Sequence, residues 1–388
     1  MTTYLACVGT RPEIIKMAPI YRTLKSRGQN IQVLHTGQHE DVAQALYTFF
    51  DMEPDYQIQL KRRLPSLSDL TAELLQGIDQ VLTEVKPDVV LVQGDTASAF
   101  VGAMASYYRD VRVAHIEAGL RTGQHDPFPE EKNRELIGRL ANWHFPPTPQ
   151  AAQNLRREGI PMQQIYEVGN TVIDAALWVK SLLDRDGASH ILTPELNSFL
   201  HHHEGSHMML VTAHRRENWG RPIQQIAASV AILLRLHPDL TVVWPLHPNP
   251  NVRADIQSVF STLDNESRQR LYLTDPLEYP ALISLLACCH FCLTDSGGIQ
   301  EEASAFHCPV LITRDSTERQ ELVDAGGAIL VGTNPHRIVE MASALLTDPL
   351  TYRAMQVHES PFGDGYSALR IADVLSYSAG TPQVESMS

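Results

Sequence analysis

The sequence predicts an α/β protein made of two doubly wound domains, each a parallel sheet wrapped by helices. Short β-rich runs alternate with helix-length segments nearly throughout, which is typical of such sheets rather than of an all-β or all-α fold. The 388 residues also exceed what one hydrophobic core usually supports. A polar stretch at about 175–206 contains no predicted strand, so we expect one domain over 1–175 and a second over 206–360.

The first half alternates β-rich runs with segments of helical spacing. The runs are short enough for strands of a buried parallel sheet. The segments between them have apolar residues at intervals that suit one face of a helix. These patterns predict helices over 12–28, 69–85, 96–109 and 130–141, and strands over 4–9, 31–36, 88–94, 112–118 and 142–147.

The second half repeats this plan. Its β-rich runs predict strands over 207–213, 240–246, 270–275, 291–295, 309–313 and 327–332. Residues 364–378 follow the last strand, and we expect them to form a helix that packs back on the first domain. Two such domains facing each other would place the carboxyl ends of both sheets around one cleft, which is the usual place for ligands.

Composition and charge limit the classes of function. With 43% hydrophobic and 20% charged residues, and no apolar run near the roughly 18 residues that span a bilayer, the chain is expected to be globular and soluble. The N-terminus has no basic lead, which argues against a cleaved signal and favours the cytoplasm. A net charge of −14 without a basic stripe argues against nucleic acid as a partner.

Cysteine and histidine clusters do not predict a metal site. The five cysteines show no even spacing typical of a disulfide framework, so we expect reduced thiols. Cys289 and Cys292 form a C-x-x-C, but at an apolar helix end that runs into a strand, where small buried cysteines are common. The HHHE run at 201–204 is interpreted as a solvated loop.

The segment TDSGGIQEEA, residues 294–303, ends a strand and opens a helix. Ser296 can cap this helix, while Gly297 and Gly298 let a ligand approach bare backbone N–H groups. A helix start has unsatisfied donors and partial positive charge, so phosphates bind there. Glu301 and Glu302, expected in the first turn, either complement the helix dipole or accept hydrogen bonds from ribose hydroxyls below a bound diphosphate. Together these residues predict a nucleoside diphosphate site.

Acidic residues end two predicted strands of the first domain. LVQGDT presents Asp95, HIEAG presents Glu117, and FPEEKNR opens a helix with Glu130 and Glu131. One such acid can simply cap the next helix, as Asp95 could, but acids on neighbouring strands converge on one edge of the sheet. Converging carboxylates without a metal indicate proton transfer or charge stabilisation. His115, beside Glu117, is interpreted as a core histidine.

Basic residues also lie at predicted strand ends. GTRPEIIKMAP places Arg11 at the edge of the first strand and Lys16 about one turn into the next helix. TAHRREN places His214, Arg215 and Arg216 at the edge of the second domain, where they suit phosphate oxygens.

Two further residues extend this basic group. His247 ends another predicted strand, and Arg319 lies near the glycine-rich helix start. The chain has no G-x-G-x-x-G fingerprint, so we expect no nicotinamide cofactor.

Six motifs together resemble those of the non-hydrolysing bacterial UDP-N-acetylglucosamine (UDP-GlcNAc) 2-epimerases. In order they are GTRPEIIKMAP, GDT, HIEAGLRT, FPEEKNR, TAHRREN and TDSGGIQEEA, and the resemblance covers about residues 4–370. It implies a glycosyltransferase-B type fold of two Rossmann-like domains and an isomerase without cofactor or metal. It also implies UDP-GlcNAc, UDP and UDP-N-acetylmannosamine (UDP-ManNAc) as ligands, a homodimer, and a role in cell-surface polysaccharide biosynthesis.

The resemblance also implies roles for individual residues. The positions matching catalytic residues are Asp95, Glu117, Glu130 and His214. Those matching residues that hold the UDP part of the substrate are Arg11, Lys16, Leu277, Leu282, Ser296, Gly297, Gly298, Glu302 and Arg319. Some relatives have an aromatic residue in place of Leu282, which leaves the packing of the uracil open.

Some relatives bind a second UDP-GlcNAc as an activator next to the active site. The positions linked to that site match Gln38, His39, Arg215 and His247. Whether this chain needs the activator stays open at the level of sequence.

The residues permit one route for inversion at C2 of the sugar. The C2 hydrogen has no adjacent carbonyl, and oxidation of a neighbouring carbon would need a nicotinamide. The remaining route breaks the C1–diphosphate bond, removes the C2 proton to give 2-acetamidoglucal and UDP, and then adds UDP back with the proton on the opposite face. We expect Asp95 and Glu117 to transfer protons, with Glu130 in support. His214 and Arg11 would stabilise the leaving group.

Three alternatives stay open. A hydrolysing UDP-GlcNAc 2-epimerase would let water capture the intermediate, and a glycosyltransferase of the same fold would pass the sugar to an acceptor. A nucleotide-sugar sensor would bind without turnover.

Overall fold

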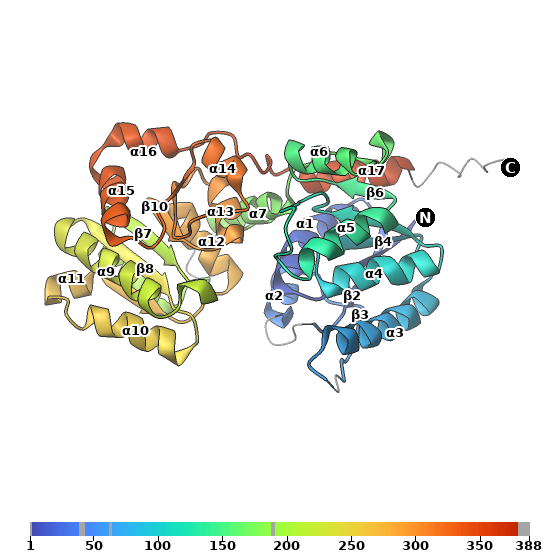
Figure 1. Ribbon diagram of the computed structural model, residues 1–388, viewed down its shortest axis with the longest axis horizontal. Helices are drawn as coiled ribbons and strands as arrows, with labels where there is room; N and C mark the ends of the chain where they lie inside the picture. The colour runs from blue at the N-terminus through green and yellow to red at the C-terminus, as the bar shows by residue number, and fades with distance from the viewer. Residues whose placement is uncertain (1, 39–42, 62–63, 188–190, 379–388) are drawn as a thin grey trace. The chain divides into compact units, whose positions relative to one another are not determined.

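The computed structural model describes residues 2–38, 43–61, 64–187 and 191–378. The chain forms two compact units (Figure 1). Unit 1 contains the residues up to Ala175 and those from Gly363 onward, and unit 2 contains Ala176–Phe362. In Figure 1 the C-terminal helix α17 (Ser367–Ser378), in red, accordingly lies among the blue and green elements of unit 1.

Unit 1 is built on a six-stranded sheet in the order β3-β2-β1-β4-β5-β6, with every neighbouring pair parallel. Its strands are β1 (Thr3–Val8), β2 (Asn30–His35), β3 (Tyr56–Gln57), β4 (Val89–Gln93), β5 (Arg112–Ile116) and β6 (Trp143–Phe145). Its helices are α1 (Arg11–Ser26), α2 (Ala43–Phe50), α3 (Leu67–Val85), α4 (Ala97–Tyr108), α5 (Glu130–Leu140), α6 (Pro149–Arg157) and α17, with the 3-10 turn η1 (Met162–Gln164). Helix α7 (Thr171–Asp186) runs from unit 1 into unit 2.

Unit 2 has the same topology. Its parallel sheet has the order β12-β11-β10-β7-β8-β9, which places the first strand of the unit beside the fourth, as in unit 1. The strands are β7 (His207–Thr212), β8 (Leu240–Pro245), β9 (Leu271–Thr274), β10 (Phe291–Thr294), β11 (Val310–Ile312) and β12 (Ala328–Leu330). In both sheets the strand order reverses between the two central strands, where doubly wound proteins bind ligands.

The helices of unit 2 fill the long connections between its strands. They are α8 (Pro194–His202), α9 (Arg221–Leu236), α10 (Pro250–Phe260), α11 (Asn265–Gln269), α12 (Tyr279–Cys288), α13 (Gly297–Ser304), α14 (Gln320–Asp324), α15 (Pro335–Thr347) and α16 (Pro349–Met355), with the 3-10 turn η3 (Arg216–Asn218). Helices α7 and α8 occupy most of the polar stretch in which the sequence shows no strand.

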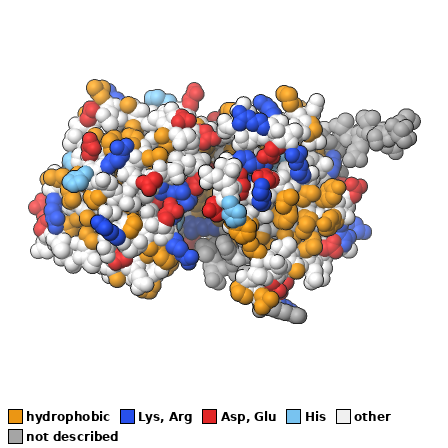
Figure 2. All heavy atoms as spheres, viewed as in Figure 1, with side chains coloured by type: hydrophobic (Ala, Val, Ile, Leu, Met, Phe, Trp, Pro, Cys, Tyr) orange, Lys and Arg blue, Asp and Glu red, His pale blue; other side chains and the backbone are white. Residues whose placement is uncertain are grey.

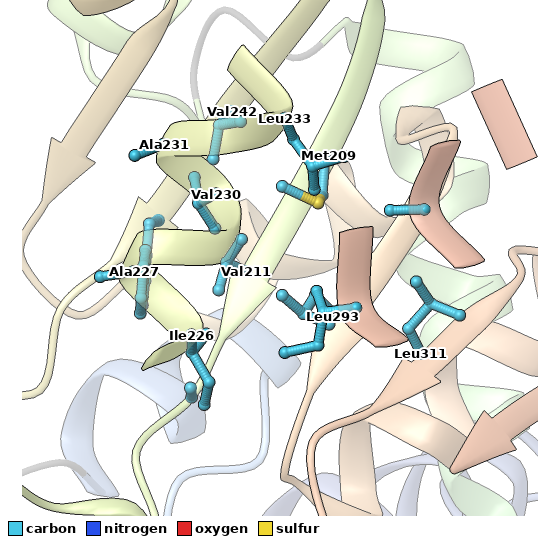
Figure 3. Close-up of a cluster of buried hydrophobic side chains, with 14 of the residues drawn as sticks. Met209, Val211, Ile226, Ala227, Val230, Ala231, Leu233, Val242, Leu293 and Leu311 are labelled. Atoms are coloured by element: carbon cyan, nitrogen blue, oxygen red, sulfur yellow. The ribbon is translucent and has the colours of Figure 1, made fainter. Parts of the chain in front are cut away.

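Hydrophobic spacing explains why these segments adopt these structures. In α3, Leu70, Leu74, Ile78 and Leu82 recur every fourth residue and are all buried against the sheet. Strand β4 is buried along its whole length, as expected for a parallel strand covered on both faces. Figure 3 shows the matching core of unit 2, in which Met209 and Val211 of β7 face Val230 of α9.

The described strands agree closely with the sequence-based prediction. Each predicted strand is present, and its ends differ by only one or two residues. Strand β3 was missed, because two residues are too few to show alternation. Within the described residues, no helix combines the length and hydropathy needed to cross a membrane.

Candidate active site

The turn between β1 and α1 positions Arg11. Thr10 is the N-cap of α1, and Glu13 Oε2 accepts hydrogen bonds from the backbone N–H groups of Gly9 (2.8 Å) and Thr10 (2.7 Å). A Cβ at Gly9 would lie 2.0 Å from Thr36 Oγ1, so only glycine fits this turn. Arg11 is therefore the first helical residue of a rigidly bonded turn, and it is partly exposed.

Glu117 follows β5 and is held by two side chains. Lys16 Nζ lies 2.5 Å from Glu117 Oε2, and Gln93 Nε2 donates to the same oxygen at 2.7 Å. The side chains of Lys16 and Glu117 are each only 9% exposed, so the two charges offset one another in a mostly dry environment. The structure thus places Lys16, which the resemblance assigned to the UDP part, against a candidate catalytic acid.

The backbone of Glu117 is strained. Its φ of 62° lies in the left-handed region, which non-glycine residues rarely adopt. Such conformations cluster at functional sites, where the surrounding structure enforces them.

Asp95 follows β4, the neighbour of β5 in the sheet. Arg134 Nε of α5 lies 2.5 Å from Asp95 Oδ2, and Asn133 Nδ2 donates to the Asp95 backbone carbonyl at 2.8 Å. The alternative that Asp95 caps the next helix is wrong, because Thr96 is the N-cap of α4 and accepts a hydrogen bond from Ala99 N–H. The Asp95 carboxylate is 21% exposed, so it keeps access to solvent.

The two acids that begin α5 have different surroundings. Glu130 is the first residue of the helix and is partly exposed. Glu131 is almost fully buried and accepts hydrogen bonds from the backbone N–H groups of Thr122 (2.9 Å) and Gly123 (3.0 Å). Glu131 thus holds a turn in place, and Glu130 is the one of the pair that can reach a ligand.

His115 is fully buried, as the sequence predicted. Its Nε2 lies 2.7 Å from the Gly94 carbonyl oxygen, and burial lowers its pKa to about 3. The imidazole is therefore neutral at physiological pH and contributes to the core.

In unit 2, helix α13 begins at Gly297 with Ser296 as its N-cap. The Ser296 side chain makes no capping hydrogen bond. A Cβ at Gly297 would lie 3.1 Å from the Arg319 guanidinium carbon, whereas a Cβ at Gly298 would have nothing nearer than Ser296 Oγ at 4.0 Å. The helix start thus combines open backbone N–H groups with an arginine, which suits a phosphate group.

The acids of α13 lie beyond its first turn, so this part of the sequence prediction was wrong. The helix starts at Gly297, which puts Glu301 and Glu302 in its second turn, and they do not complement the dipole there. Glu301 Oε1 accepts a hydrogen bond from Arg319 Nε at 2.9 Å, which holds the guanidinium at the helix start. Glu302 is buried as well.

Asp295 anchors the other central turn of unit 2. Its fully buried carboxylate accepts hydrogen bonds from His214 N–H, Arg215 N–H and Asn218 Nδ2, at 2.8–2.9 Å to Oδ2. The His214 side chain is 47% exposed, with Nδ1 3.5 Å from Asp295 Oδ1. Asp295 therefore joins the end of β10 to the turn after β7 and presents the His214 imidazole to solvent.

The positions linked to the activator site are described in part. Gln38 Oε1 accepts a hydrogen bond from Ser98 Oγ at 2.7 Å, and His39 lies outside the described residues. Arg215 Nη1 lies 3.9 Å from a Glu318 carboxylate oxygen. Burial, with His214 nearby, lowers the pKa of His247, whose ring lies 5.5 Å from that of Trp219.

The two leucines expected near uracil are partly buried. Leu277 lies in the connection between β9 and α12, and Leu282 lies within α12. Position 282 itself is a leucine, so it offers no aromatic ring for stacking on a base.

The cysteine and histidine clusters noted in the sequence lie outside the candidate site residues described above. Cys289 and Cys308 are buried thiols with sulfur atoms 3.3 Å apart. The HHHE run is not a loop throughout, because His201 and His202 end helix α8, although the side chains of His201 and Glu204 are exposed as expected. Among the described residues, no group of three or more His, Cys, Asp or Glu side chains could hold a metal ion. On the face shown in Figure 2, basic and acidic side chains are interspersed rather than gathered into a basic stripe.

Several site residues were not found from the sequence. Glu13 could have been found, because the spacing of Thr10 and Glu13 is that of a capping box. Arg134 and Gln93 had no local signal, because their roles depend on contacts with residues far away in the chain.

The matching family model and a curated relative carry the same description. A family model described as UDP-N-acetylglucosamine 2-epimerase matches residues 22–376. A UDP-N-acetylglucosamine 2-epimerase of Yersinia pestis is 41% identical over 378 residues, which are 96% of this chain and 97% of that protein.

Two similar solved structures are also UDP-GlcNAc 2-epimerases. The UDP-GlcNAc 2-epimerase of Neisseria meningitidis bound to UDP-GlcNAc has a TM-score of 0.84 and 37% identity, covering 97% of this chain and 100% of that one. The Methanocaldococcus jannaschii enzyme in complex with UDP-GlcNAc and UDP has a TM-score of 0.76 and 31% identity, with the same coverage. A kitacinnamycin glycosyltransferase, 12% identical over 97% of this chain and 99% of its own, has a TM-score of 0.63 and shares the fold alone. The expected glycosyltransferase-B type fold is confirmed.

Proposed function

This chain belongs to the UDP-N-acetylglucosamine 2-epimerase family and is an isomerase with that activity, and we propose that it works by eliminating and re-adding UDP. The C1–oxygen bond to the diphosphate breaks, and its electron pair leaves with UDP. Loss of the C2 proton to a base then gives neutral 2-acetamidoglucal. Re-addition of UDP at C1, with a proton delivered to the other face of C2, gives UDP-ManNAc.

One observation carries this proposal: two acids on neighbouring strands, each fixed by its own basic partner. Asp95 is paired with Arg134 and Glu117 with Lys16, at the carboxyl ends of β4 and β5. Held in this way, one carboxylate can accept the C2 proton and the other can return one. Glu130 would support these two acids.

Hydrogen-bond donors and basic side chains would hold the diphosphate and stabilise the negative charge that it gains when the C1–oxygen bond breaks. We assign the phosphate oxygens to the start of α13, at Ser296, Gly297 and Gly298, with Arg319 beside them. His214 and Arg11 would stabilise the departing diphosphate. One preorganised donor of this kind lowers a barrier by about 3–4 kcal/mol.

The remaining substrate contacts follow the resemblance to the family. Glu302 would accept hydrogen bonds from the ribose hydroxyls, and Leu277 and Leu282 would contact the uracil. Lys16 would contact the UDP part of the substrate while keeping its ion pair with Glu117.

Three broader statements belong to this proposal. UDP-GlcNAc, UDP and UDP-ManNAc are the ligands of the chain, and the resemblance links Gln38, His39, Arg215 and His247 to an activator site for a second UDP-GlcNAc. The protein would act in the cytoplasm. It would form a homodimer, which light scattering on the purified protein would test.

The experiment that tests the reaction uses purified protein and UDP-GlcNAc in D₂O. We expect UDP-ManNAc to form and the C2 position of both sugars to gain deuterium, because the proton is exchanged with solvent. Free N-acetylmannosamine with UDP would instead indicate a hydrolysing epimerase. Transfer only when a sugar acceptor is added would indicate a glycosyltransferase, and binding without turnover would indicate a sensor.

A further inference from the structure

Glu13 is a carboxylate buried beneath the two central turns of unit 1. It is 1% exposed and uses both of its oxygen atoms. Oε2 accepts the backbone N–H groups of Gly9 and Thr10, and Oε1 accepts the hydroxyl of Thr96 at 2.5 Å. Thr96 lies 83 residues further along the chain.

Capping alone does not explain this arrangement. A capping box needs only one Glu oxygen to reach back to the N-cap backbone, and such a Glu can lie in solvent. A buried carboxylate has a large desolvation cost unless several donors bind it. Here the second oxygen binds a residue of another helix, so the carboxylate links two elements.

The hydrogen bonds of Thr96 have a defined direction. Its Oγ1 accepts Ala99 N–H at 3.1 Å as the N-cap of α4. Its single hydroxyl hydrogen is therefore donated to Glu13. This chain of hydrogen bonds fixes the Thr96 side chain and the backbone next to it.

The link joins the two turns where the strand order of the sheet reverses. The turn after β1 carries Arg11, and the turn after β4 carries Asp95, which directly precedes Thr96. Asp95 is also held by Arg134 and Asn133 of α5. Its position thus depends on the α5 contacts and on the contact between Thr96 and Glu13.

We propose that Glu13 and Thr96 are positioning residues for the epimerase reaction: their hydrogen bond fixes the backbone that carries Asp95 relative to the turn that carries Arg11. This inference rests on the role of Asp95 in the proposed function. Neither residue needs to contact the substrate.

The first test is Thr96→Val, which keeps the shape of the side chain and removes the hydroxyl. We expect kcat to fall about 10- to 100-fold, because small displacements of a reacting group have effects of this size. KM is expected to change less than about threefold, since the candidate UDP groups of α13 are untouched. Thr96→Ser keeps the hydroxyl and should restore kcat to within about threefold of wild type.

The matched control is Thr148→Val. Thr148 is likewise a threonine N-cap of unit 1, at α6, and its hydroxyl oxygen accepts Ala151 N–H at 3.2 Å; it is buried, whereas Thr96 is partly exposed. We expect this variant to lower the melting temperature about as much as Thr96→Val and to leave kcat unchanged. Equal loss of kcat in both variants would reduce the effect to general destabilisation and overturn the proposal.

Glu13→Gln tests the other end of the link. The amide keeps the shape, but it has one accepting oxygen where Glu13 has two, so it cannot accept both the backbone N–H groups and the Thr96 hydroxyl. Because Glu13 also holds the turn of Arg11, we expect this variant to lose both kcat and UDP affinity, whereas Thr96→Val loses kcat alone. Unchanged kcat in both variants would also overturn the proposal.

Asp95→Asn, measured in the same series, separates a failure of the positioning role of Thr96 from a failure of the catalytic role of Asp95. If Asp95→Asn is inactive and Thr96→Val turns over normally, only the positioning proposal fails. If Asp95→Asn keeps full turnover, the role of Asp95 in the proposed function fails, and the positioning proposal fails with it.

Discussion

At the scale of single residues, each unit buries one carboxylate beneath its two central turns. Glu13 accepts three hydrogen bonds in unit 1, and Asp295 accepts those of His214, Arg215 and Asn218 in unit 2. Both therefore fix the turns that present Arg11 or His214. A carboxyl group that accepts several hydrogen bonds makes such turns rigid, and rigid turns can hold side chains in reactive positions.

The Glu13 carboxyl predicts a pH dependence of stability. Burial raises its pKa from 4.5 to about 7, although hydrogen bonds from Thr96, Gly9 and Thr10 oppose the shift. The folded state therefore binds this proton more tightly than the unfolded state. The contribution of this proton binding to the free energy of unfolding is fully present below about pH 4.5 and is lost as the pH rises through about 7.

Urea unfolding of wild type and Glu13→Gln at pH 5 and pH 8 measures this effect. Between these pH values the free energy of unfolding of wild type should fall by about 2–3 kcal/mol more than that of the variant. Other groups, such as the buried His115, titrate in both proteins and cancel in the difference. Parallel pH profiles of the two proteins would contradict the prediction.

We expect the Asp95→Asn variant to lose turnover but to keep its affinity for UDP. The amide keeps the shape of the side chain but is a far weaker base, so kcat should fall about 100- to 10,000-fold. UDP affinity, measured by calorimetry, should stay within about threefold of wild type. Equal loss of turnover and affinity would make Asp95 a binding or structural residue.

The control for this variant is Asp79→Asn. Asp79 makes the same kind of contact, with Arg109 Nε 2.5 Å from its Oδ1, but on the exposed surface of unit 1. This substitution removes an equivalent ion pair and should leave kcat unchanged.

At the scale of elements, the start of α13 shows how glycines create a binding surface. Glycine within a helix costs up to about 1 kcal/mol of stability relative to alanine. Two in succession at the first helical positions therefore indicate a role other than folding. Gly297 leaves space for the Arg319 guanidinium, and Gly298 borders open space.

The two glycines predict different outcomes for alanine substitution. Gly298→Ala should raise the free energy of unfolding by up to about 1 kcal/mol, because nothing obstructs the methyl group, yet lower UDP affinity about tenfold or more. Gly297→Ala should lower UDP affinity without stabilising the protein, because its Cβ displaces the guanidinium. Thermal unfolding and UDP titration measure both quantities. Wild-type UDP affinity in Gly298→Ala would exclude backbone contact with the diphosphate at this position.

At the scale of the whole molecule, the chain leaves unit 1 after Ala175 and returns to it at Gly363. Helix α17 holds the C-terminal part of the chain on unit 1. Its Ala368 N–H donates a hydrogen bond to Asp174 of α7 at 2.8 Å, and its Arg370 donates one to the Val168 carbonyl at 3.1 Å. Each unit also has its own hydrophobic core. The last helix of the chain therefore contributes to the stability of the first unit.

Ile371→Ala tests this connection. Ile371 of α17 is fully buried, so the substitution should lower the free energy of unfolding of unit 1 by about 2–5 kcal/mol. Hydrogen exchange should then speed up for the amides of β4 and β5 and stay unchanged for those of β7 and β10. Leu369→Ala is the control on the same helix, because Leu369 is 43% exposed and its loss should cost less than about 0.5 kcal/mol. Equal acceleration in both units would show that they unfold together.

The sequence by itself determined the local structure and the chemistry at the strand ends. Apolar runs and helical spacing are local signals, so each predicted strand lies within two residues of the observed one, whereas the short elements β3 and α2 were not predicted. The acids Asp95 and Glu117 were predicted to meet at one sheet edge, and they follow β4 and β5, which pair in parallel.

Only the tertiary structure decided which groups hold these acids. Lys16 lies 101 residues from Glu117 in sequence, Arg134 lies 39 from Asp95, and Glu13 lies 83 from Thr96, yet each pair is in hydrogen-bonding contact. The left-handed backbone of Glu117 has no sequence signal either, because the surrounding fold imposes it. Spacing along the chain reports neighbours within a helix or a strand, whereas these contacts form only when separate strands bring their ends to the same edge of a sheet.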